Sequence, residues 1–428
     1  MSSVKGKICD SGENYGIHAE AMKAGAHNQR SAKVVHLVPA VGRHSFGIGA
    51  LAVDLMRYQN AEGLAASIWC IDTLEEVAWV NQSLGLSTNW IRRFEPCRYG
   101  FAGYAPRMER EVRRVCDDDR PKVVHLHGIW TGLSRVALKW HERRSTPVVV
   151  AAQGALEPWA LRKSHWKKKL ALVGYESKNL HGASCLQACG EQEIASFREF
   201  GLRNPIALIP NGVAESWMKD PGDPTAFRRR HSIPDGTRIM LFVSRITPKK
   251  GLPMAIEALH GLRYQFQGWQ FVIAGINEFE HQHEIQELTR RLGLEDIIRF
   301  IGPVHGDDKR NAFAAAELFL LPTYSEGNPL VVLEALGARV PVITTKGAPW
   351  RDLIRYGCGW WTDISTEAIG TALADALGMP ASELAALGHR GFDLVNREYN
   401  WSEIARKTIR LYDWLAGEAS QPEFVNVI

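Results

Sequence analysis

The sequence predicts an α/β protein made of two doubly wound domains, each built around a parallel sheet. Three observations support this. The chain has 428 residues, enough for two large domains. Along most of it, short β-branched runs alternate with helical patterns, as they do in βαβ units. Residues 214–236 form a polar stretch with Pro221, Pro224 and Pro234, and we expect it to be the interdomain linker.

The first series of elements predicts an N-terminal domain over residues 34–213. Its expected strands are Val34–Val38, Ser67–Ile71, Val123–His127, Val148–Ala152 and Pro205–Val213, and its expected helices are Ala50–Gln59, Arg107–Val115 and Ser134–Arg143. The preceding residues, 1–33, are polar and have no apolar core. We therefore expect a loose tail there and no signal peptide.

The second series predicts a C-terminal domain over residues 237–398. The expected strands are Arg238–Val243, Gln270–Ala274, Ile298–Ile301, Leu318–Leu321 and Val340–Thr344, and the expected helices are Pro253–Leu262, His283–Leu292, Leu330–Leu336 and Glu383–Asn396. The remaining residues, 399–428, contain one more helix, Ser402–Leu415. Ser402 and Glu403 predict a capping motif at its start.

Composition excludes several classes of protein. Hydrophobic residues make up 45% and charged residues 23%, which is ordinary for a globular protein and excludes a mostly disordered chain. The sequence lacks the ~18-residue apolar run that a spanning helix needs. A net charge of +4 is too small for a dedicated nucleic-acid binder, so we expect no nucleic-acid partner. The seven scattered cysteines form no CxxC pair, which favours a reducing compartment.

The strongest motif lies at residues 324–335, where a predicted strand leads through a loop into a helix. Asn328 suits the N-cap and Pro329 the first helical position, and a helix N-terminus favours a phosphate. Glu326 in the loop and Glu334 in the helix would repel phosphate, so we expect them to accept hydrogen bonds from sugar or ribose hydroxyls. Taken alone, the segment is more typical of a surface helix with one capping and one solvated acid.

A second motif lies at residues 242–251. Arg245 follows the end of a predicted strand, and Lys250 precedes a helix. Two cations at the carboxyl end of a strand suit a diphosphate. By itself the segment is equally compatible with a basic turn in solvent.

Together these segments resemble the family 4 glycosyltransferases of the GT-B class, over roughly Val34–Leu415. Glu326 and Glu334 match the family's paired glutamates, which are separated by seven residues, and Arg245 and Lys250 match its R-x4-KG segment. Five further stretches match the family in order: the glycine loop with Gly47 and Gly49, His125–Gly128, Pro210–Val213, Ile273–Gly275 and Phe300–Val304.

The resemblance implies a GT-B fold, in which two Rossmann-like domains face a cleft and the C-terminal helix crosses back to the N-terminal domain. It implies that Glu326 contacts the donor sugar, Glu334 the ribose, and Arg245 and Lys250 the donor phosphates. The rest of the implied donor site consists of Gly47, Gly49, Gly327, Asn328, Pro329 and Leu330.

His127 is the remaining catalytic candidate, because it ends a strand and precedes Gly128. By resemblance it points toward the donor sugar and the acceptor. We expect His125 to lie on the opposite face of the strand and to serve packing. The sequence departs from the family pattern at Asn328, where an aromatic residue is common, and in its longer glycine loop.

The acceptor side is assigned to Gln153, Glu157, Trp159, Lys167 and Lys168. Gln153 and Glu157 lie in a segment that resembles the acceptor side of bacterial polysaccharide members of the family. The segment 159–170 that follows interleaves two tryptophans with five cations. This pattern favours an interfacial helix on an anionic membrane surface, and an exposed helix with solvated lysines is the alternative.

The expected function is that of a retaining, metal-independent hexosyltransferase. It would move a sugar from a nucleoside diphosphate to a lipid-linked glycan in bacterial surface polysaccharide or exopolysaccharide synthesis, from the cytoplasmic face of the membrane. We expect no cofactor and no metal, since Asp117–Asp119 lies away from the strand carboxyl ends. A non-hydrolysing sugar-nucleotide epimerase and a catalytically silent nucleotide-sugar-binding subunit are the alternatives.

Overall fold

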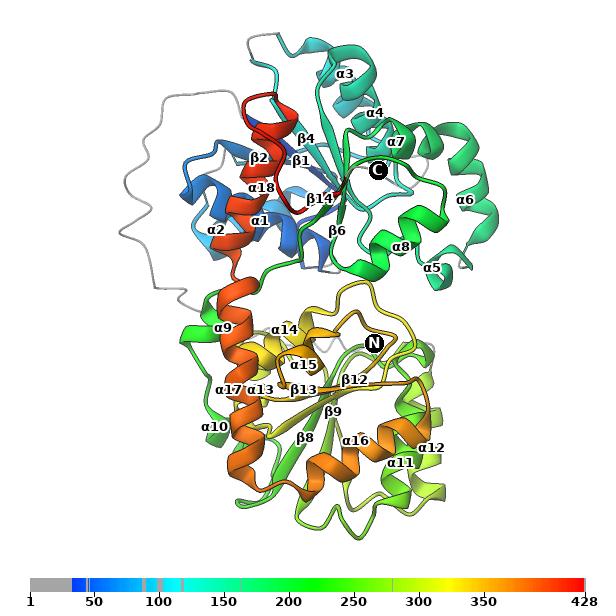
Figure 1. Ribbon diagram of the computed structural model, residues 1–428, viewed down its shortest axis with the longest axis vertical. Helices are drawn as coiled ribbons and strands as arrows, with labels where there is room; N and C mark the ends of the chain where they lie inside the picture. Colours follow the sequence, from blue (N-terminus) through cyan, green and yellow to red (C-terminus); the bar gives the residue numbers. More distant parts are fainter. Residues whose placement is uncertain are drawn as a thin grey trace, which may run out of the picture.

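The computed structural model describes residues 33–43, 45, 47–86, 90–97, 103–116, 119–162, 164–278 and 280–426. The tail expected at residues 1–33 lies outside these residues except for Lys33. The described chain forms two α/β domains, one above the other in Figure 1. Each has a sheet with helices on both faces, so the predicted fold class is confirmed.

The N-terminal domain holds an eight-stranded sheet in the order β14-β7-β6-β5-β4-β1-β2-β3, parallel except at β14. Its strands are β1 (Val34–Val38), β2 (Ala66–Cys70), β3 (Ile91–Arg93), β4 (Val123–His127), β5 (Val148–Ala151), β6 (Cys185–Ala188), β7 (Ile206–Leu208) and β14 (Val425–Asn426). Its helices are α1 (Ile48–Ala61), α2 (Leu74–Leu84), α3 (Pro106–Arg114), α4 (Gly132–Arg144), α5 (Pro158–Arg162), α6 (His165–Ala171), the π-helix η2 (Leu172–Glu176), α7 (Ser177–Gly182) and α8 (Glu191–Glu199). The strand expected over Pro205–Val213 is shorter, because β7 ends at Leu208 and Val213 forms only an isolated bridge to Asn400.

The C-terminal domain holds a six-stranded parallel sheet in the order β10-β9-β8-β11-β12-β13. Its strands are β8 (Arg238–Val243), β9 (Trp269–Ala274), β10 (Ile298–Gly302), β11 (Leu318–Leu321), β12 (Val342–Thr345) and β13 (Gly359–Thr362). Its helices are α11 (Leu252–Gly261), α12 (His281–Arg291), α13 (Gly306–Ala315), α14 (Leu330–Gly337), α15 (Asp352–Arg355), α16 (Thr366–Gly378) and α17 (Ala381–Glu398), with the short 3-10 helix η3 (Pro248–Lys250).

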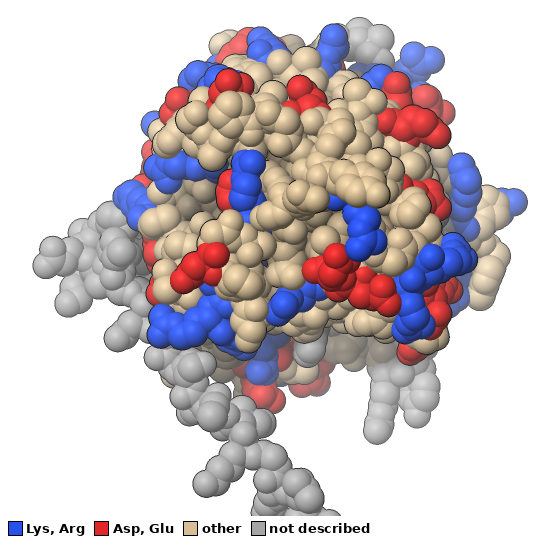
Figure 2. All heavy atoms as spheres, turned by 90° about the horizontal axis from the view of Figure 1, so that it is seen from below, with Lys and Arg blue, Asp and Glu red and all other residues tan. Residues whose placement is uncertain are grey.

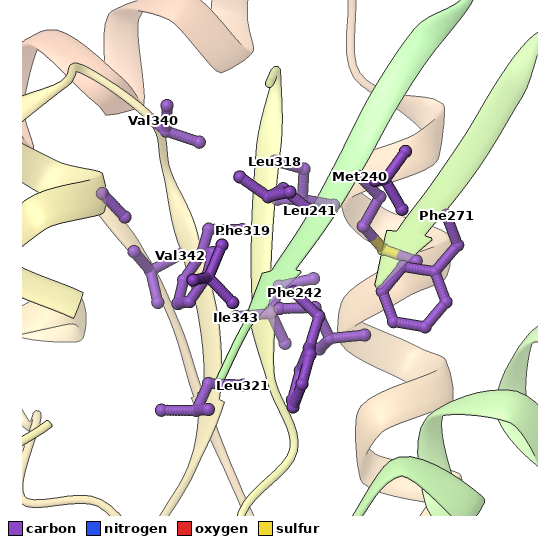
Figure 3. Close-up of a cluster of buried hydrophobic side chains, with 14 of the residues drawn as sticks. Met240, Leu241, Phe242, Phe271, Leu318, Phe319, Leu321, Val340, Val342 and Ile343 are labelled. Atoms are coloured by element: carbon purple, nitrogen blue, oxygen red, sulfur yellow. The ribbon is translucent and has the colours of Figure 1, made fainter. Parts of the chain in front are cut away.

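The core of the C-terminal domain explains why its strands read as continuous apolar runs. Strands β9, β11 and β12 are buried along their whole length, because helices cover both faces of the sheet. Figure 3 shows side chains from neighbouring strands interleaved in this core, among them Phe242, Phe271 and Phe319. This rigid layer fixes the strand ends from which the site loops leave.

The segment expected to be a linker, residues 214–236, packs against the C-terminal domain. It contains α9 (Ser216–Lys219) and α10 (Pro224–Arg230), which contact α14 and α13 respectively. Phe227 and Ile233 are buried in the core of that domain. Its proline and glycine content therefore marks a change of domain without producing a loose connection.

The C-terminal segment returns to the N-terminal domain. Helix α17 runs up the C-terminal domain, and α18 (Trp401–Leu415) continues beside α1 (Figure 1). Asn400 caps α18 by accepting from the backbone N–H of Glu403, so the cap expected at Ser402 was wrong by two residues. Trp401 packs over Gly212, where an added Cβ would lie 2.6 Å from the indole ring.

No helix within the described ranges is long and apolar enough to cross a bilayer. At the end of the molecule formed by the C-terminal domain, basic and acidic side chains are intermixed (Figure 2).

Truncating Trp401 tests the return of the C-terminal segment. Trp401 is buried in the core of the N-terminal domain and faces Tyr58. We expect Trp401→Ala to lower the free energy of unfolding by ~3–5 kcal/mol, measured by urea denaturation. The exposed Trp166 provides the control, since Trp166→Ala removes a ring that is 64% exposed and should change stability by less than ~0.5 kcal/mol. Equal effects of the two substitutions would contradict the packing described for α18.

Candidate active site

The donor-side cations lie where β8 ends, as expected for a phosphate site. Arg245 lies two residues after the end of β8, and Lys250 is the last residue of η3. Gly251 then adopts φ +67°, and an added Cβ there would overlap the carbonyl of Pro322. Only glycine allows this approach, which brings Lys250 against the loop that follows β11.

Lys250 and Glu326 form a buried ion pair. The Lys250 Nζ lies 2.5 Å from Glu326 Oε1, which also accepts from the Thr323 hydroxyl at 2.9 Å. Burial lowers the pKa of Lys250, and the charge of Glu326 opposes this effect. The two residues assigned to phosphate and to sugar are thus preorganised as one unit.

Two further cation–carboxylate pairs lie in the C-terminal domain. Arg245, whose side chain is about half exposed, contacts both oxygens of Glu278 at 3.0 and 3.1 Å. Lys309, which the sequence motifs do not mark, lies 2.6 Å from the carboxylate of Glu334. The Lys309 ammonium also lies 5.5 Å from the centre of the Trp217 ring. A ribose that bonds to Glu334 would therefore meet a carboxylate already held by a cation.

Helix α14 begins at the residue that the sequence predicts, but its cap position differs from the prediction. It starts at Leu330, and Pro329 occupies the cap position without any side-chain hydrogen bond, so the expected capping by Asn328 was wrong. The Asn328 side chain instead lies near the thiol of Cys189, in the other domain, and moderates the rise in the pKa of that thiol. Leu330 packs against the cores of both domains. This end of α14 is therefore a contact between the domains.

The loop that carries Gln153 and Glu157 faces the donor loop directly. Ser325 donates a hydrogen bond of 2.9 Å to Glu157, which joins the two domains. Gly154 lies so close to Gly327 that an added Cβ on Gly154 would be 3.0 Å from the Gly327 Cα. Burial raises the pKa of Glu157. The structure thus brings the loop of Gln153 and Glu157 against the loop that carries Glu326, and the acceptor and donor roles of these residues stay predictions.

His127 belongs to a buried histidine cluster. His36, on the neighbouring strand β1, lies 2.9 Å from His127 (Nδ1 to Nε2) and 2.8 Å from Gln59 (Nε2 to Oε1). His125 stacks on His127 with ring centroids 4.1 Å apart, and it hydrogen-bonds to the Tyr412 hydroxyl at 2.6 Å. His125 and His127 therefore share one face of β4, which corrects the expectation of opposite faces. Residues two apart in a strand point the same way.

The same cluster is the place where a metal ion would find ligands. One nitrogen from each of His36, His125 and His127 can be chosen so that all three lie within 4.8 Å of one another. Both nitrogens of His36 are already hydrogen-bonded, to His127 and to Gln59. The contacts thus account for His36 without a metal, and metal independence stays a prediction.

The two glycines expected in the donor site lie at the start of α1. Gly47 adopts φ +90° at the cap position, and Gly49 lies in the first turn, where a side chain would overlap the carbonyl of Ala40. Ile48, between them, contacts Gly128 after β4. The glycine loop therefore lies beside the end of β4, in the N-terminal domain.

The basic and aromatic segment forms helices α5, α6 and η2 on the outside of the N-terminal domain. Lys167 is exposed, whereas Lys168 bends back to the carbonyl of Ala160 and lies 5.7 Å from the Trp130 ring centre. The side chain of Trp159 lies outside the described residues. Three apolar side chains at helical spacing are exposed there: Trp166 (64%), Leu170 (58%) and Val173 (88%). Sequence reasoning did not single out Leu170 or Val173.

Comparison with known proteins agrees with this geometry. The family model "Glycosyl transferase 4-like domain" matches residues 46–212, and "Glycosyl transferases group 1" matches residues 223–391. A GDP-mannose:cellobiosyl-diphosphopolyprenol alpha-mannosyltransferase of Komagataeibacter xylinus is 24% identical over 301 residues, 69% of this chain and 72% of the relative. The putative colanic acid biosynthesis glycosyltransferase WcaL of Salmonella typhimurium is 28% identical over 49% of this chain and 53% of its own.

Solved structures show the same fold. Anabaena HepE, in complex with UDP and glucose, superposes with a TM-score of 0.71 at 17% identity, covering 90% of this chain and all of that one. WaaG, a glycosyltransferase involved in lipopolysaccharide biosynthesis, gives a TM-score of 0.62 at 17% identity, also covering 90% of this chain and all of its own. The fold and the paired motifs define a glycosyltransferase of the GT-B class. This chain belongs to family 4 of those enzymes.

The histidine cluster predicts a loss of stability in acid. Burial lowers the pKa of His36 to about 4, and burial lowers the pKa values of His125 and His127 well below the usual 6.5. Below pH ~6.5 these histidines therefore bind protons in the unfolded chain while they remain neutral in the folded protein. We expect the free energy of unfolding to be fully maintained above pH ~6.5 and to fall as the pH drops toward 4, by ~1.4 kcal/mol per pH unit for each such proton.

Urea denaturation at several pH values, with His36→Gln beside the exposed His283→Gln, measures this effect. The slope of stability against pH should become shallower for His36→Gln and stay unchanged for His283→Gln. Identical slopes for wild type and His36→Gln would contradict the assignment.

Proposed function

We propose that this protein transfers a hexose from a nucleoside-diphosphate sugar to a lipid-linked glycan acceptor, in the synthesis of a bacterial surface polysaccharide or exopolysaccharide. Transfer proceeds with retention of configuration and without a metal ion, on the cytoplasmic side of the membrane. The observation that carries the proposal is the Lys250–Glu326 pair, which lies directly opposite the loop of Gln153 and Glu157. The names of the relatives, a diphosphopolyprenol mannosyltransferase and a colanic acid glycosyltransferase, support the class of acceptor.

On binding, the donor would take the place of some of the carboxylate partners that the cations have now. Its diphosphate takes the charge of Arg245 and Lys250, and its ribose hydroxyls bond to Glu334. Arg245, Lys250 and Lys309 are each already paired with a carboxylate, and Lys249 adds a further positive charge near Lys250 and Glu157. The anionic diphosphate then adds charge where fixed cations and the N-terminus of α14 can stabilise it.

The transfer step follows from this placement. The acceptor hydroxyl attacks the sugar carbon from the N-terminal side, on the face that the diphosphate leaves. Arg245 and Lys250 stabilise the negative charge that develops on the departing diphosphate. The departing phosphate oxygen takes the proton of the acceptor hydroxyl, so no protein carboxylate needs to act as nucleophile.

Two alternative functions, an epimerase and a silent binding subunit, would give different outcomes with the same donor. An epimerase would need an acid or base in the N-terminal domain, and Glu157 is a carboxylate that faces the donor loop. A silent binding subunit would bind donor without turnover. Incubation with labelled UDP- and GDP-sugars and no acceptor separates the three, because an epimerase yields epimer, a transferase slow hydrolysis, and a binding subunit neither. A thermal-shift screen with UDP, GDP, ADP and dTDP identifies the base.

Removing Lys250 tests the diphosphate role. We expect Lys250→Ala to reduce turnover about a hundredfold, the usual cost of losing one preorganised charge-stabilising group. Turnover is measured as release of the nucleoside diphosphate from the donor that the screen selects. Lys346→Ala, which removes an exposed lysine of the same domain, should retain wild-type turnover. Near-normal turnover in Lys250→Ala would refute the assignment.

Helix α6 carries the proposal of membrane attachment. The exposed stripe of Trp166, Leu170 and Val173 lies beside the exposed Lys167 and Lys169. Tryptophan and aliphatic side chains enter the headgroup boundary, and each lysine near an anionic surface adds ~1 kcal/mol. This arrangement suits the acceptor, because a lipid-linked glycan is presented at the membrane.

Vesicle co-sedimentation tests the attachment. Replacing Lys167 and Lys169 with Gln should weaken binding to anionic vesicles, and wild-type binding should fall as salt rises. Lys168 is left in place because it already contacts Ala160 and Trp130. Replacing Lys219 and Lys346 with Gln is the control and should leave binding unchanged. Equal binding of wild type to neutral vesicles would exclude the electrostatic contribution, and no binding at any salt would exclude the attachment itself.

A further inference from the structure

A buried carboxylate, Glu193, holds the acceptor-side loop in place. Glu193 lies in the first turn of α8 and is 3% exposed. Its Oε1 accepts the backbone N–H of Gly154 at 2.7 Å, and its Oε2 accepts the backbone N–H of Cys189 at 2.9 Å. One side chain therefore ties the loop after β5 to the turn after β6.

The loop has a backbone conformation that needs such support. Gln153 adopts φ +52° and Gly154 φ +76°, so two consecutive residues lie in the left-handed region. A non-glycine residue rarely occupies that region unless its surroundings hold it there. The Gln153 side chain supplies a second tie, since its amide bonds to Asn211 in the Pro210–Val213 turn at 3.2 and 3.4 Å.

The far side of the same loop meets the donor domain. Gly154, whose N–H Glu193 accepts, is the residue that lies against Gly327, and Glu157 accepts from Ser325 three residues later. The position of the loop thus sets how closely the acceptor side approaches the donor sugar. A shift of the Gly154 backbone would move this contact directly.

We infer that Glu193 is a positioning residue for glycosyl transfer, which sets the loop of residues 153–157 against the donor-sugar loop. Among the described residues, no hydrogen bond or ion pair joins Glu193 to Arg245, Lys250, Glu326 or Glu334, and Glu193 acts through Gly154. This inference rests on the proposed function for its kinetic consequence, whereas the tie between Glu193 and the loop can be tested without any substrate.

The ionised form of Glu193 is the form that accepts both N–H groups. Burial raises the pKa of Glu193 to about 7, the two backbone N–H groups oppose the rise, and the negative charge of Glu157 adds to it. The Cys189 thiol is the other titratable group that acts on it. Protonation below pH 7 would place an O–H against one of the two donors and weaken that tie.

The test uses Glu193→Gln in the full-length protein, with Glu191→Gln as the matched control. Glu191 lies two residues earlier on α8 and is exposed. In Glu193→Gln the amide oxygen can accept only one N–H, and the amide NH2 group faces the other. We expect hydrogen exchange in the segments that contain Gly154 and Cys189 to accelerate at least tenfold. Glu191→Gln should exchange like wild type.

Kinetics supply the readout that a purely structural role would not move. Wild-type turnover should fall as the pH drops through about 7. Glu193→Gln should lose at least tenfold in turnover at pH 8, change the donor KM by less than twofold, and show no pH dependence in that range. Glu193→Asp keeps the charge and should recover part of the turnover, which excludes a folding defect as the cause.

Two results would overturn the inference: unchanged exchange in the loop of Glu193→Gln, or a pH profile parallel to that of wild type. If wild type turns over no donor, the proposed function fails. The exchange measurement then still decides whether Glu193 holds the loop.

Discussion

Helix α18 follows the C-terminal domain in sequence, yet it buries Trp401, Ile404 and Tyr412 in the core of the N-terminal domain. Tyr412 reaches His125 and, more weakly, Gln59, so a polar chain runs from the last helix through α1 to the sheet. The chain therefore crosses between the domains twice, near Val213 and near Asn400, and these two crossings pair with each other as a β-bridge. This double crossing constrains the relative position of the two domains. The contact between the loop of Glu157 and the loop of Ser325 depends on that position.

Between the two domains, charged side chains are already paired or buried before any ligand binds. Each donor-side cation is held by a carboxylate, and the acceptor-side carboxylates Glu157 and Glu193 have raised pKa values because they are buried. The cation pairs keep long side chains in one geometry, which lowers the entropy lost when a diphosphate binds. The same pairs keep buried charges from remaining uncompensated. In the proposed function, this preorganisation would stabilise the charge that develops on the departing diphosphate.

The sequence predicted the fold class, and it placed Lys250 and Glu326 near strand ends and Glu334 in a helix, where the structure has them, while their assigned roles stay predictions. It failed where contacts join distant segments. Lys309 and Glu193 carry no motif, and their partners lie 25 and 39 residues away. The histidine cluster likewise depends on the register of β1 with β4, in which His36 lies opposite His125. Strand alternation alone would have placed His125 and His127 on one face. The caps of α14 and α18 were displaced by one and two residues, because helix ends are the least certain part of a pattern: Pro329 takes the cap of α14 without a side-chain hydrogen bond, and Asn400 offers α18 a polar cap ahead of Ser402.

The meeting of Gly154 and Gly327 has a consequence for the spacing of the two domains. At that point the two domains touch through bare main chain, with an added Cβ on either glycine only 3.0 or 3.1 Å from the opposite Cα. A single methyl group at either position would push the two main chains apart by an amount that the length of the Cα–Cβ bond sets. Alanine at residue 154 would also bring its Cβ within 3.2 Å of a Glu157 carboxylate oxygen and would strain a backbone whose φ is +76°, so the two glycines are not equivalent. Gly327 adjoins Glu326, so a wider contact at that glycine would shift the loop that carries Glu326 as well, and the spacing of the two domains is fixed by both glycines together.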